Sequence, residues 1–343
     1  MYTIAFAGGG TAGHVMPNLA IISALGGDCR CVYIGCDGME KSLCEARGIP
    51  FYTISAVKLR RDKFFKNLAV PFKLHACVKS AKKVLNEIKP DLIFSKGGYA
   101  ALPVVLGAGR IPVVSHESDF SPGLCTKLAK RKSQRILCAF EPCAARIKRA
   151  EHVGAPLNPA LYRGKSKRAA FGFDGSKPVI AVVGGSSGAA AINDCVKSAL
   201  PKLTACFDVI HVTGKGKAVC EKQRGYRPIE FENDMPGLYA SVDMIVTRGG
   251  ANALAEAIAL KIPALCIPLE KASRGDQLQN ARYYEERGAI KVLRESDMTP
   301  TTLAAAVAEL FNAKDRYARA MSELSVDGTK QICDIIKETL NKN

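Results

Sequence analysis

One local pattern occurs twice in this sequence of 343 residues: an apolar run, a glycine-rich turn and a helix-like segment. It spans residues 4–25 in the first half and residues 179–200 in the second. Apolar runs that alternate with helical segments are typical of parallel sheets covered by helices on both faces. The repeat therefore predicts an α/β protein built from two Rossmann-like domains, each with a parallel sheet.

Further short apolar runs continue the alternation within each half. They read CVYIG, PDLIFS, IPVVSH and RILCAF in the first half, and FDVIHVTG, VDMIVT and PALCIP in the second. Helices are predicted at residues 16–25, 189–200, 252–260 and 331–343. Proline and glycine cluster at residues 156–165, which predicts a linker. We therefore expect one domain over residues 1–158, a second over 159–325 and a C-terminal helical segment over 326–343.

Composition excludes several classes of protein. Hydrophobic residues make up 48% of the chain, which is ample for a buried core and too much for a disordered or fibrous protein. The thirteen cysteines show no Cys-x-x-Cys spacing, so we expect buried free thiols in a reducing compartment. The N-terminus lacks an export signal and no uncharged run is long enough to span a bilayer, which together predict a protein that is neither exported nor membrane-spanning.

The net charge of +17 is concentrated in the first half, and most strongly in residues 57–83. This basic segment contains nine Lys or Arg, one Asp, and the aromatic residues Phe64, Phe65 and Phe72. Basic and large apolar residues together favour contact with an anionic membrane surface. The charge alone would also fit a nucleic-acid groove, or a solvated helix with its apolar face in the core.

The first glycine-rich turn, residues 8–14 (GGGTAGH), follows a predicted strand. Ligands of open parallel sheets bind beyond the carboxyl ends of the strands, and a helix start attracts anions. His14 stands at the mouth of this turn, where it could act in catalysis, contact a phosphate or simply cap the helix. Gly8, Gly10 and Gly13 also match the dinucleotide fingerprint, which keeps a nicotinamide-dependent oxidoreductase open as an alternative.

Two turns of the second half point to a nucleoside diphosphate. Residues 184–188 (GGSSG) offer main-chain amides and the hydroxyl of Ser186 at a helix start. In the run that begins at Arg248, RGGANALAE, the first amides of the helix can hold phosphate oxygens. Glu256 could accept both hydroxyls of a ribose, or could merely favour the helix N-terminus.

Two further segments carry polar side chains near predicted strand ends. Gln277, in the loop at residues 272–281, offers both a donor and an acceptor to sugar hydroxyls. Tyr99 follows one N-terminal strand, and His116, Glu117 and Asp119 follow the next. No Asp-x-Asp pair occurs that could clasp a divalent ion on a diphosphate, so we expect neither an obligate metal nor another cofactor.

These motifs together resemble one known family. GGGTAGHVMPNLAI, SKGGYAALP, SHESDFSPGL, VVGGSSGAAAIN, HVTGKG, TRGGANALAEAIALKIPALCIPL and ASRGDQLQNA occur in the order seen in the MurG family of peptidoglycan N-acetylglucosaminyltransferases. The similarity runs over residues 3–330, and SHESD and ASRGDQ are similar to the Firmicutes branch. The resemblance implies a GT-B fold, in which two Rossmann-like domains face each other across a cleft and the C-terminal helix crosses back to the N-domain.

The resemblance also implies an activity and a location. It implies inverting transfer of N-acetylglucosamine from UDP-N-acetylglucosamine to the 4-hydroxyl of undecaprenyl-diphospho-N-acetylmuramoyl-pentapeptide. The enzyme would act in cell-wall synthesis as a peripheral protein on the cytoplasmic face of the membrane, without a nucleic-acid partner. The remaining alternatives are another GT-B UDP-sugar transferase with a lipid acceptor, the oxidoreductase, and a non-catalytic lipid- or nucleic-acid-binding protein.

Site residues follow from the same resemblance. It implies donor contacts at Thr11, Ala12, Gly13, Ser186, Arg248, Ala251, Asn252, Ala253, Leu254, Ala255, Glu256 and Gln277. It implies acceptor contacts at Thr11, Gly13, His14 and Tyr99, with membrane contact at Phe64, Phe65 and Phe72. His14 is the first candidate for the general base because imidazole titrates near neutral pH, and Asp119 and Glu117 are alternatives.

The chain departs from its relatives at two of these positions. Many relatives have an arginine donor contact where this chain has Asn158, and Arg163 is the nearest substitute. Relatives outside the branch often have asparagine where this chain has Asp119, so an acid here would replace an amide contact.

Overall fold

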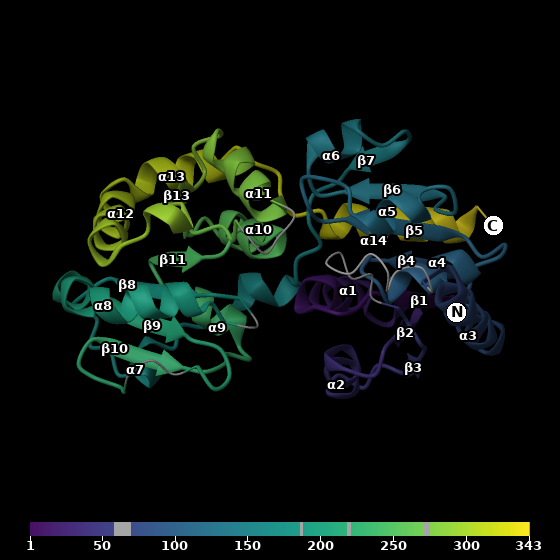
Figure 1. Ribbon diagram of the computed structural model, residues 1–343, viewed down its shortest axis with the longest axis horizontal. Coiled ribbons are helices and arrows are strands. Elements are labelled where there is room, and N and C mark those ends of the chain that lie inside the picture. The colour runs from purple at the N-terminus through teal and green to yellow at the C-terminus, as the bar shows by residue number, and fades with distance from the viewer. Residues whose placement is uncertain (58–69, 186–187, 218–220, 271–274, 343) are drawn as a thin grey trace. The chain divides into compact units, whose positions relative to one another are not determined.

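The computed structural model describes the whole chain except residues 58–69, 186–187, 218–220, 271–274 and 343 (Figure 1). It divides into two compact units, one of residues 1–158 with 327–343 and the other of residues 159–326. Each unit contains one parallel sheet with helices around it. The predicted α/β class with two Rossmann-like folds is confirmed.

The first unit is built on a seven-stranded sheet in the order β3-β2-β1-β4-β5-β6-β7. Its strands are β1 (Thr3–Ala7), β2 (Arg30–Gly35), β3 (Phe51–Thr53), β4 (Leu92–Ser95), β5 (Val113–Glu117), β6 (Arg135–Cys138) and β7 (Ala150–His152). Its helices are α1 (Ala12–Leu25), α2 (Met39–Glu45), α3 (Val70–Ile88), α4 (Ala101–Gly107), α5 (Leu124–Ala129), α6 (Glu141–Ala145) and α14 (Thr329–Asn341), with a 3-10 turn η1 (Gly26–Asp28).

Strand β1 lies inside the first sheet, between β2 and β4, and is covered on both faces. Ile4 and Phe6 belong to the hydrophobic cluster formed with α1 and α14. Ala5 and Ala7 point to the opposite face, in the cluster formed with α3 and α4. Alternate residues of a strand point to opposite faces, so burial of both faces requires the continuous apolar run seen in the sequence.

Helix α14 belongs to the first unit although it is the last element of the chain. Ile332 and Ile336 are fully buried in the cluster with α1. At the helix start, the Leu157 N–H donates to the Thr329 hydroxyl oxygen (2.7 Å), and that hydroxyl donates to the Leu157 carbonyl (2.9 Å). These contacts join α14 to the segment that ends the first part of the unit.

The second unit has a six-stranded sheet in the order β10-β9-β8-β11-β12-β13. Its strands are β8 (Val179–Val183), β9 (Asp208–Val212), β10 (Tyr226–Ile229), β11 (Met244–Thr247), β12 (Ala264–Cys266) and β13 (Lys291–Val292). Its helices are α7 (Arg168–Phe171), α8 (Ala190–Cys206), α9 (Met235–Tyr239), α10 (Ala251–Ala259), α11 (Asp276–Glu285), α12 (Pro300–Asn312) and α13 (Lys314–Ser322), with 3-10 turns η3 (Pro159–Arg163) and η4 (Glu295–Asp297).

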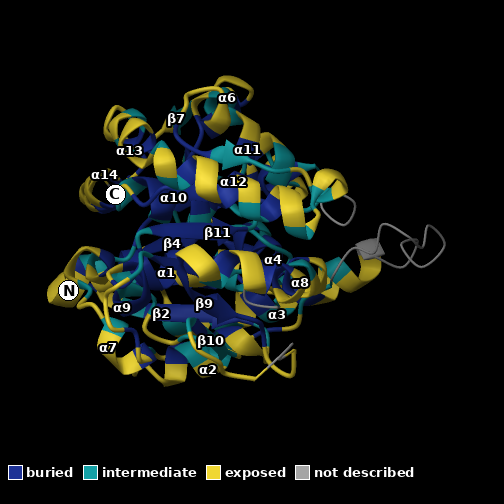
Figure 2. Ribbon diagram, turned by 90° about the vertical axis from the view of Figure 1, so that its left-hand side faces the viewer, coloured by how far each residue is buried: buried dark blue, intermediate teal, exposed yellow. Residues whose placement is uncertain are grey.

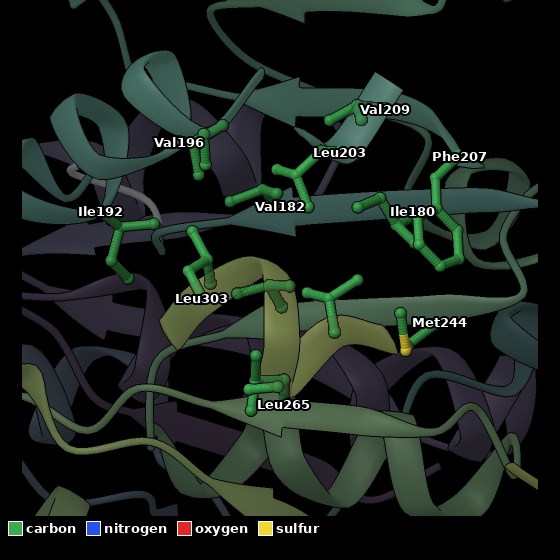
Figure 3. Close-up of a cluster of buried hydrophobic side chains, with 14 of the residues drawn as sticks. Ile180, Val182, Ile192, Val196, Leu203, Phe207, Val209, Met244, Leu265 and Leu303 are labelled. Atoms are coloured by element: carbon green, nitrogen blue, oxygen red, sulfur yellow. The ribbon is translucent and has the colours of Figure 1, made fainter. Parts of the chain in front are cut away.

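The core of the second unit lies between the sheet and helices α8 and α12. Figure 3 shows Val182 of β8 and Leu265 of β12 directed toward side chains of these helices, among them Leu203 and Leu303. Figure 2 shows strands β9 and β11 in the dark blue of buried residues, with exposed residues on the outer face of α12. Apolar burial at one helix face and on both sheet faces stabilises the unit.

Both sheets reverse their strand order next to their first strand. In the first unit this switch point lies between β1 and β4, and in the second between β8 and β11. Crevices at such points are the usual ligand sites of open parallel sheets. The turns at residues 8–14, 96–99, 184–188 and 248–250 follow these four strands, so each unit carries two candidate ligand turns at its switch point.

The basic segment is described only in part. Phe64 and Phe65 lie outside the described residues, whereas Phe72 lies on α3 with 83% of its surface exposed. Helix α3 buries Cys77, Ala81 and Leu85 and exposes lysines on its other side. In the described part of the chain, no helix is both long enough and apolar enough to cross a bilayer.

Candidate active site

The first glycine turn is enclosed by side chains that leave no room for a Cβ atom. A Cβ on Gly9 would lie 2.4 Å from Glu40 Oε1, and one on Gly10 would lie 2.3 Å from Tyr99 Cε1. Gly10 also has a φ of +89°, a conformation that L side chains rarely adopt. Gly10 is therefore required by its backbone conformation and by Tyr99, whereas a Cβ at Gly9 would force the Glu40 side chain to shift. Tyr99, a predicted acceptor contact, lies against this turn.

A buried polar network supports the same turn from the core side. The Asn18 amide donates to the Tyr33 hydroxyl oxygen (3.1 Å), and the Tyr33 hydroxyl donates to the Gly8 carbonyl (3.2 Å). Asn18 and Tyr33 are completely buried, and burial raises the pKa of the Tyr33 hydroxyl, which stays protonated as the donor. The network holds the main chain at the start of the turn.

His14 lies in the first turn of α1, because this helix begins at Ala12 and not near residue 16 as predicted. Pro17 lies inside this helix. Proline is most common at the first position of a helix, but here the helix continues through it with the loss of one main-chain hydrogen bond. His14 Nδ1 forms a 2.9 Å hydrogen bond with Thr11 Oγ1. A Cβ on Gly98 would lie 3.2 Å from His14 Nδ1, so the turn after β4 packs directly on His14.

Glu117 ends β5 and is almost completely buried. Its carboxylate accepts hydrogen bonds from the N–H groups of Ser118 (3.0 Å), Asp119 (3.3 Å) and Gly123 (2.7 Å), and from the Thr126 hydroxyl (2.5 Å). A carboxylate engaged by four donors organises the loop after β5. This geometry favours a structural role for Glu117 and leaves His14 and Asp119 as the candidate bases.

The third residue predicted beside Glu117 and Asp119, His116, is directed into the interior. It is 1% exposed, and its Nε2 lies 2.9 Å from the Gly154 carbonyl, so Nε2 carries the proton. Burial and the nearby Lys96 ammonium hold the pKa of His116 well below its usual range. His116 is therefore a neutral buried residue behind the loop.

The glycine turn after β8 is held by a buried network of its own; Ser186 of this turn lies outside the described residues. A Cβ on Gly188 would lie 2.2 Å from the Thr213 carbonyl oxygen, to which the Asn193 amide donates (2.9 Å). His211 Nε2 donates to the Asn193 carboxamide oxygen (3.0 Å), and its Nδ1 accepts from the Tyr226 hydroxyl (3.0 Å). Burial lowers the pKa of His211 to about 4, which keeps the ring neutral in this network.

The start of α11 packs on the turn after β11. A Cβ on Gly249 would lie 2.4 Å from the main-chain oxygen of Gln277, and the Asn280 amide donates to the Gly249 carbonyl (3.1 Å). The Gln277 side-chain oxygen accepts from the Leu269 N–H (2.9 Å). Gln277 thus lies against the turn after β11, and the nitrogen of its side-chain amide is the group that can contact a ligand.

Arg248 directly follows β11, and its positive charge is paired within the second unit. Its guanidinium pairs with Glu295 of η4 and donates to the Ile267 carbonyl (3.2 Å). The Arg248 side chain is only 11% exposed. A contact between Arg248 and a diphosphate must therefore be shared with Glu295 or must replace that pair.

Helix α10 carries the remaining predicted donor contacts. Ala251, Leu254 and Ala255 are buried, so they can meet a ligand mainly through their main chain, whereas Asn252 and Ala253 are half-buried. The Tyr239 hydroxyl of α9 donates to Glu256 Oε2 (2.7 Å). Burial raises the pKa of Glu256 to about 7, and the hydrogen bond from Tyr239 opposes this rise.

Three residues near these sites were not assigned a role from the sequence: Glu40, Lys96 and Tyr239. Glu40 and Tyr239 each lie within a short helix, and Lys96 is the first residue of the turn at residues 96–99. The sequence offers one signal for such a residue, a charge directly after an apolar strand, and among these three residues only Lys96 shows it.

Comparison with known proteins agrees with this arrangement. Residues 4–138 match the glycosyltransferase family 28 N-terminal domain, and residues 179–338 match the family 28 C-terminal domain. A protein of Lachnospira eligens named UDP-N-acetylglucosamine--N-acetylmuramyl-(pentapeptide) pyrophosphoryl-undecaprenol N-acetylglucosamine transferase is 43% identical over 98% of this chain and 99% of its own. The protein of the same name from Geobacillus thermodenitrificans is 41% identical over 98% of each chain. The chain belongs to the MurG family of glycosyltransferases.

Solved structures support the same assignment. The crystal structure of Acinetobacter baumannii MurG matches with a TM-score of 0.76 and 26% identity, over 98% of this chain and 99% of that one. The calicheamicin glycosyltransferase CalG4 matches with a TM-score of 0.74 at 16% identity, which shows a shared fold alone. The family and the GT-B fold predicted from the MurG-like motifs are therefore confirmed. The alternatives of an oxidoreductase and of a non-catalytic binding protein are excluded.

Proposed function

We propose that this chain is a UDP-N-acetylglucosamine-dependent glycosyltransferase that converts undecaprenyl-diphospho-N-acetylmuramoyl-pentapeptide (lipid I) to lipid II in peptidoglycan synthesis. The observation that carries this proposal is the 40–43% identity, over nearly the full length, to enzymes named for this transfer. The two switch points with glycine turns support it, because each unit offers a place for one anionic substrate.

The second unit is the proposed donor site. Helices α8 and α10 follow the switch-point strands β8 and β11, so the main-chain amides at their starts suit the diphosphate of UDP, and the Glu256 carboxylate suits the ribose hydroxyls. As UDP leaves, negative charge grows on the diphosphate, and helix starts together with Arg248 stabilise it. The chain's own groups thus supply this stabilisation, so we propose that transfer requires no metal ion.

The first unit is the proposed acceptor site. The diphosphate of the lipid acceptor suits the turn at residues 8–14, where Gly10, Thr11 and Gly13 are exposed at the start of α1. The sugar 4-hydroxyl attacks the anomeric carbon of N-acetylglucosamine as the bond to UDP breaks, which inverts that carbon. The hydroxyl proton passes to a base, for which His14 is the first candidate.

A transfer assay tests this function. Purified full-length protein, radiolabelled UDP-N-acetylglucosamine and a water-soluble lipid I analogue are expected to give a labelled disaccharide product, with and without excess EDTA. UDP-glucose is expected to give little product. Transfer from UDP-glucose at an equal rate, or transfer to a different acceptor class only, would contradict the proposed function, and loss of transfer in EDTA would contradict only the metal-free part.

Replacing His14 with alanine is expected to lower kcat by about 10²- to 10⁴-fold, the usual contribution of a general base, with little change in the acceptor KM. Exposed His75 on α3 provides the control, because His75→Ala also removes an imidazole from the same unit. Steady-state kinetics with the soluble acceptor measures both variants. A His14→Ala rate within about threefold of the original would exclude His14 as the base.

We also propose that residues 57–83 dock the enzyme on an anionic membrane. Helix α3 supports this with exposed Phe72, Lys73, Lys79, Lys82 and Lys83. Sedimentation with anionic vesicles at low salt is expected to show binding that falls when Phe64, Phe65 and Phe72 become serine and the lysines become glutamine, because both apolar insertion and charge attraction are lost. Changing exposed Lys197 and Lys222 to glutamine is the control, and equal pelleting of the two variants would exclude this surface.

A further inference from the structure

Lys96 is a buried lysine at the carboxyl end of β4. Its side chain is 2% exposed, and its Nζ donates to the hydroxyl oxygen of Ser118. Among the described residues it has no other side-chain hydrogen bond and no ion pair. An ammonium group has three N–H donors and is costly to bury without compensation, so the placement of Lys96 calls for a reason beyond packing.

The groups that face Lys96 come from β5, from the loop after it and from β6. Glu117, Asp119 and Cys138 raise the pKa of Lys96, but burial lowers it more strongly, to about 8. The fourth group, His116, is neutral. Glu117 is engaged by four donors, and Asp119 is the other acid close to Lys96 in this loop.

Lys96 also borders the first glycine turn. Its main-chain N–H donates to the Ala7 carbonyl (2.9 Å), directly before that turn. Two residues later, a Cβ on Gly98 would lie 2.6 Å from the Gly9 carbonyl oxygen and 3.2 Å from His14 Nδ1. Lys96 therefore connects the turn that packs on His14 with the loop that carries Asp119.

We propose that Lys96 is a positioning residue of the acceptor site: its ammonium group holds Ser118, and this contact keeps the Asp119 loop in place beside the His14 turn. This inference rests on the proposed function, because it assigns the acceptor to the first unit. Loss of the Lys96 charge weakens its hydrogen bond to Ser118 and loosens the loop, so acceptor use falls while donor use, which depends on the second unit, does not.

Three variants separate the parts of this proposal. Lys96→Met keeps the length and burial of the side chain and removes the charge. Lys96→Arg keeps a charge that does not titrate below about pH 12. Ser118→Ala keeps the lysine and removes its partner. Exposed Lys132, replaced with methionine, is the matched control.

The measurements are kcat and KM for the soluble acceptor and for UDP-N-acetylglucosamine between pH 6 and 10. We expect Lys96→Met and Ser118→Ala to lower kcat/KM for the acceptor by about 10- to 100-fold, as for a small misplacement of reacting groups, with the donor KM within about twofold. The original enzyme should lose acceptor kcat/KM above about pH 8, where Lys96 deprotonates. Lys96→Arg should restore most of the activity and move this alkaline limb upward.

The outcomes distinguish the proposal from the function on which it rests. Failure of the original enzyme to transfer sugar would overturn the proposed function. Transfer by the original enzyme, with an unchanged acceptor kcat/KM and alkaline limb in Lys96→Met, would overturn the role of Lys96 alone. If Lys96→Met does not fold, as judged by thermal melting, Ser118→Ala and Lys96→Arg decide: an unchanged acceptor kcat/KM in the first, or an unmoved limb in the second, overturns the proposal.

Discussion

Replacing Gly98 with alanine is expected to lower kcat/KM for the acceptor by at least about 100-fold. The new Cβ would lie 2.6 Å from the Gly9 carbonyl oxygen, so the main chain of the glycine turn or of residues 97–99 has to move. His14 lies against the same Cβ position and would be displaced with it. Misplacement of a catalytic group by about 1 Å is sufficient for a loss of this size.

The control for this variant is Gly26→Ala. Gly26 has a φ of +59° and Gly98 a φ of +79°, so alanine at either position would have to adopt a backbone conformation that L side chains rarely take. A Cβ on Gly26 meets nothing within 4 Å. Thermal melting should therefore show that both variants lose stability, and transfer kinetics should show a large loss of activity in Gly98→Ala only. Full activity in a folded Gly98→Ala protein would place the acceptor chemistry elsewhere.

Replacing Glu256 with glutamine is expected to have opposite effects on donor use and on stability. A glutamine side chain has one acceptor oxygen and no charge, so it cannot accept both ribose hydroxyls as a carboxylate can. Charge-assisted hydrogen bonds contribute about 1.5–3 kcal/mol, which corresponds to a loss of about 10- to 100-fold in kcat/KM for UDP-N-acetylglucosamine. Kinetics and donor-dependent thermal shifts measure this loss.

The stability effect of the same variant follows from the raised pKa of Glu256. Burial raises this pKa from 4.5 to about 7, so the folded protein prefers the protonated carboxyl. The stability that the proton provides is complete below about pH 4.5 and is lost as the pH rises through about 7. At pH 8 the ionised carboxylate therefore destabilises the fold, by about 1–2 kcal/mol once its partial exposure is considered.

Urea unfolding at pH 4.5 and pH 8 measures this difference. Glu256→Gln should be more stable than the original protein at pH 8 and nearly equal to it at pH 4.5, because glutamine resembles the protonated acid. Exposed Glu286 on the surface after α11 gives the control variant Glu286→Gln, for which no such pH-dependent gain is expected. A Glu256→Gln protein that is less stable at pH 8 would show that the carboxylate is well solvated in the fold.

The central strands were predictable because burial on both faces leaves a distinctive pattern. Strands β1, β8 and β11 are almost completely buried and read as continuous apolar runs. Three of the four edge strands, β3, β7 and β13, are two or three residues long and half-buried or exposed, so their sequences contain no comparable signal. Short edge strands depend on pairing with a neighbour, which the local sequence does not encode.

The glycine turns were recognised as candidate ligand turns from sequence for a physical reason too. A glycine-rich turn between a buried strand and a helix indicates close packing or close approach of an anion, whatever surrounds it. The sequence did not reveal what fills the space around each glycine. Glu40 and Tyr99, which exclude a Cβ at Gly9 and Gly10, come from other parts of the chain.

The sequence alone identified the chain as two parallel α/β units of the MurG family. The apolar runs, the glycine-rich turns and the order of the motifs can all be read directly along the chain. Tertiary structure alone decided which polar groups meet. It directs Arg248 to Glu295, Tyr239 to Glu256 and Lys96 to Ser118. These partners lie on separate loops and helices, and strand order at the sheet edge brings them together, which no local sequence pattern specifies.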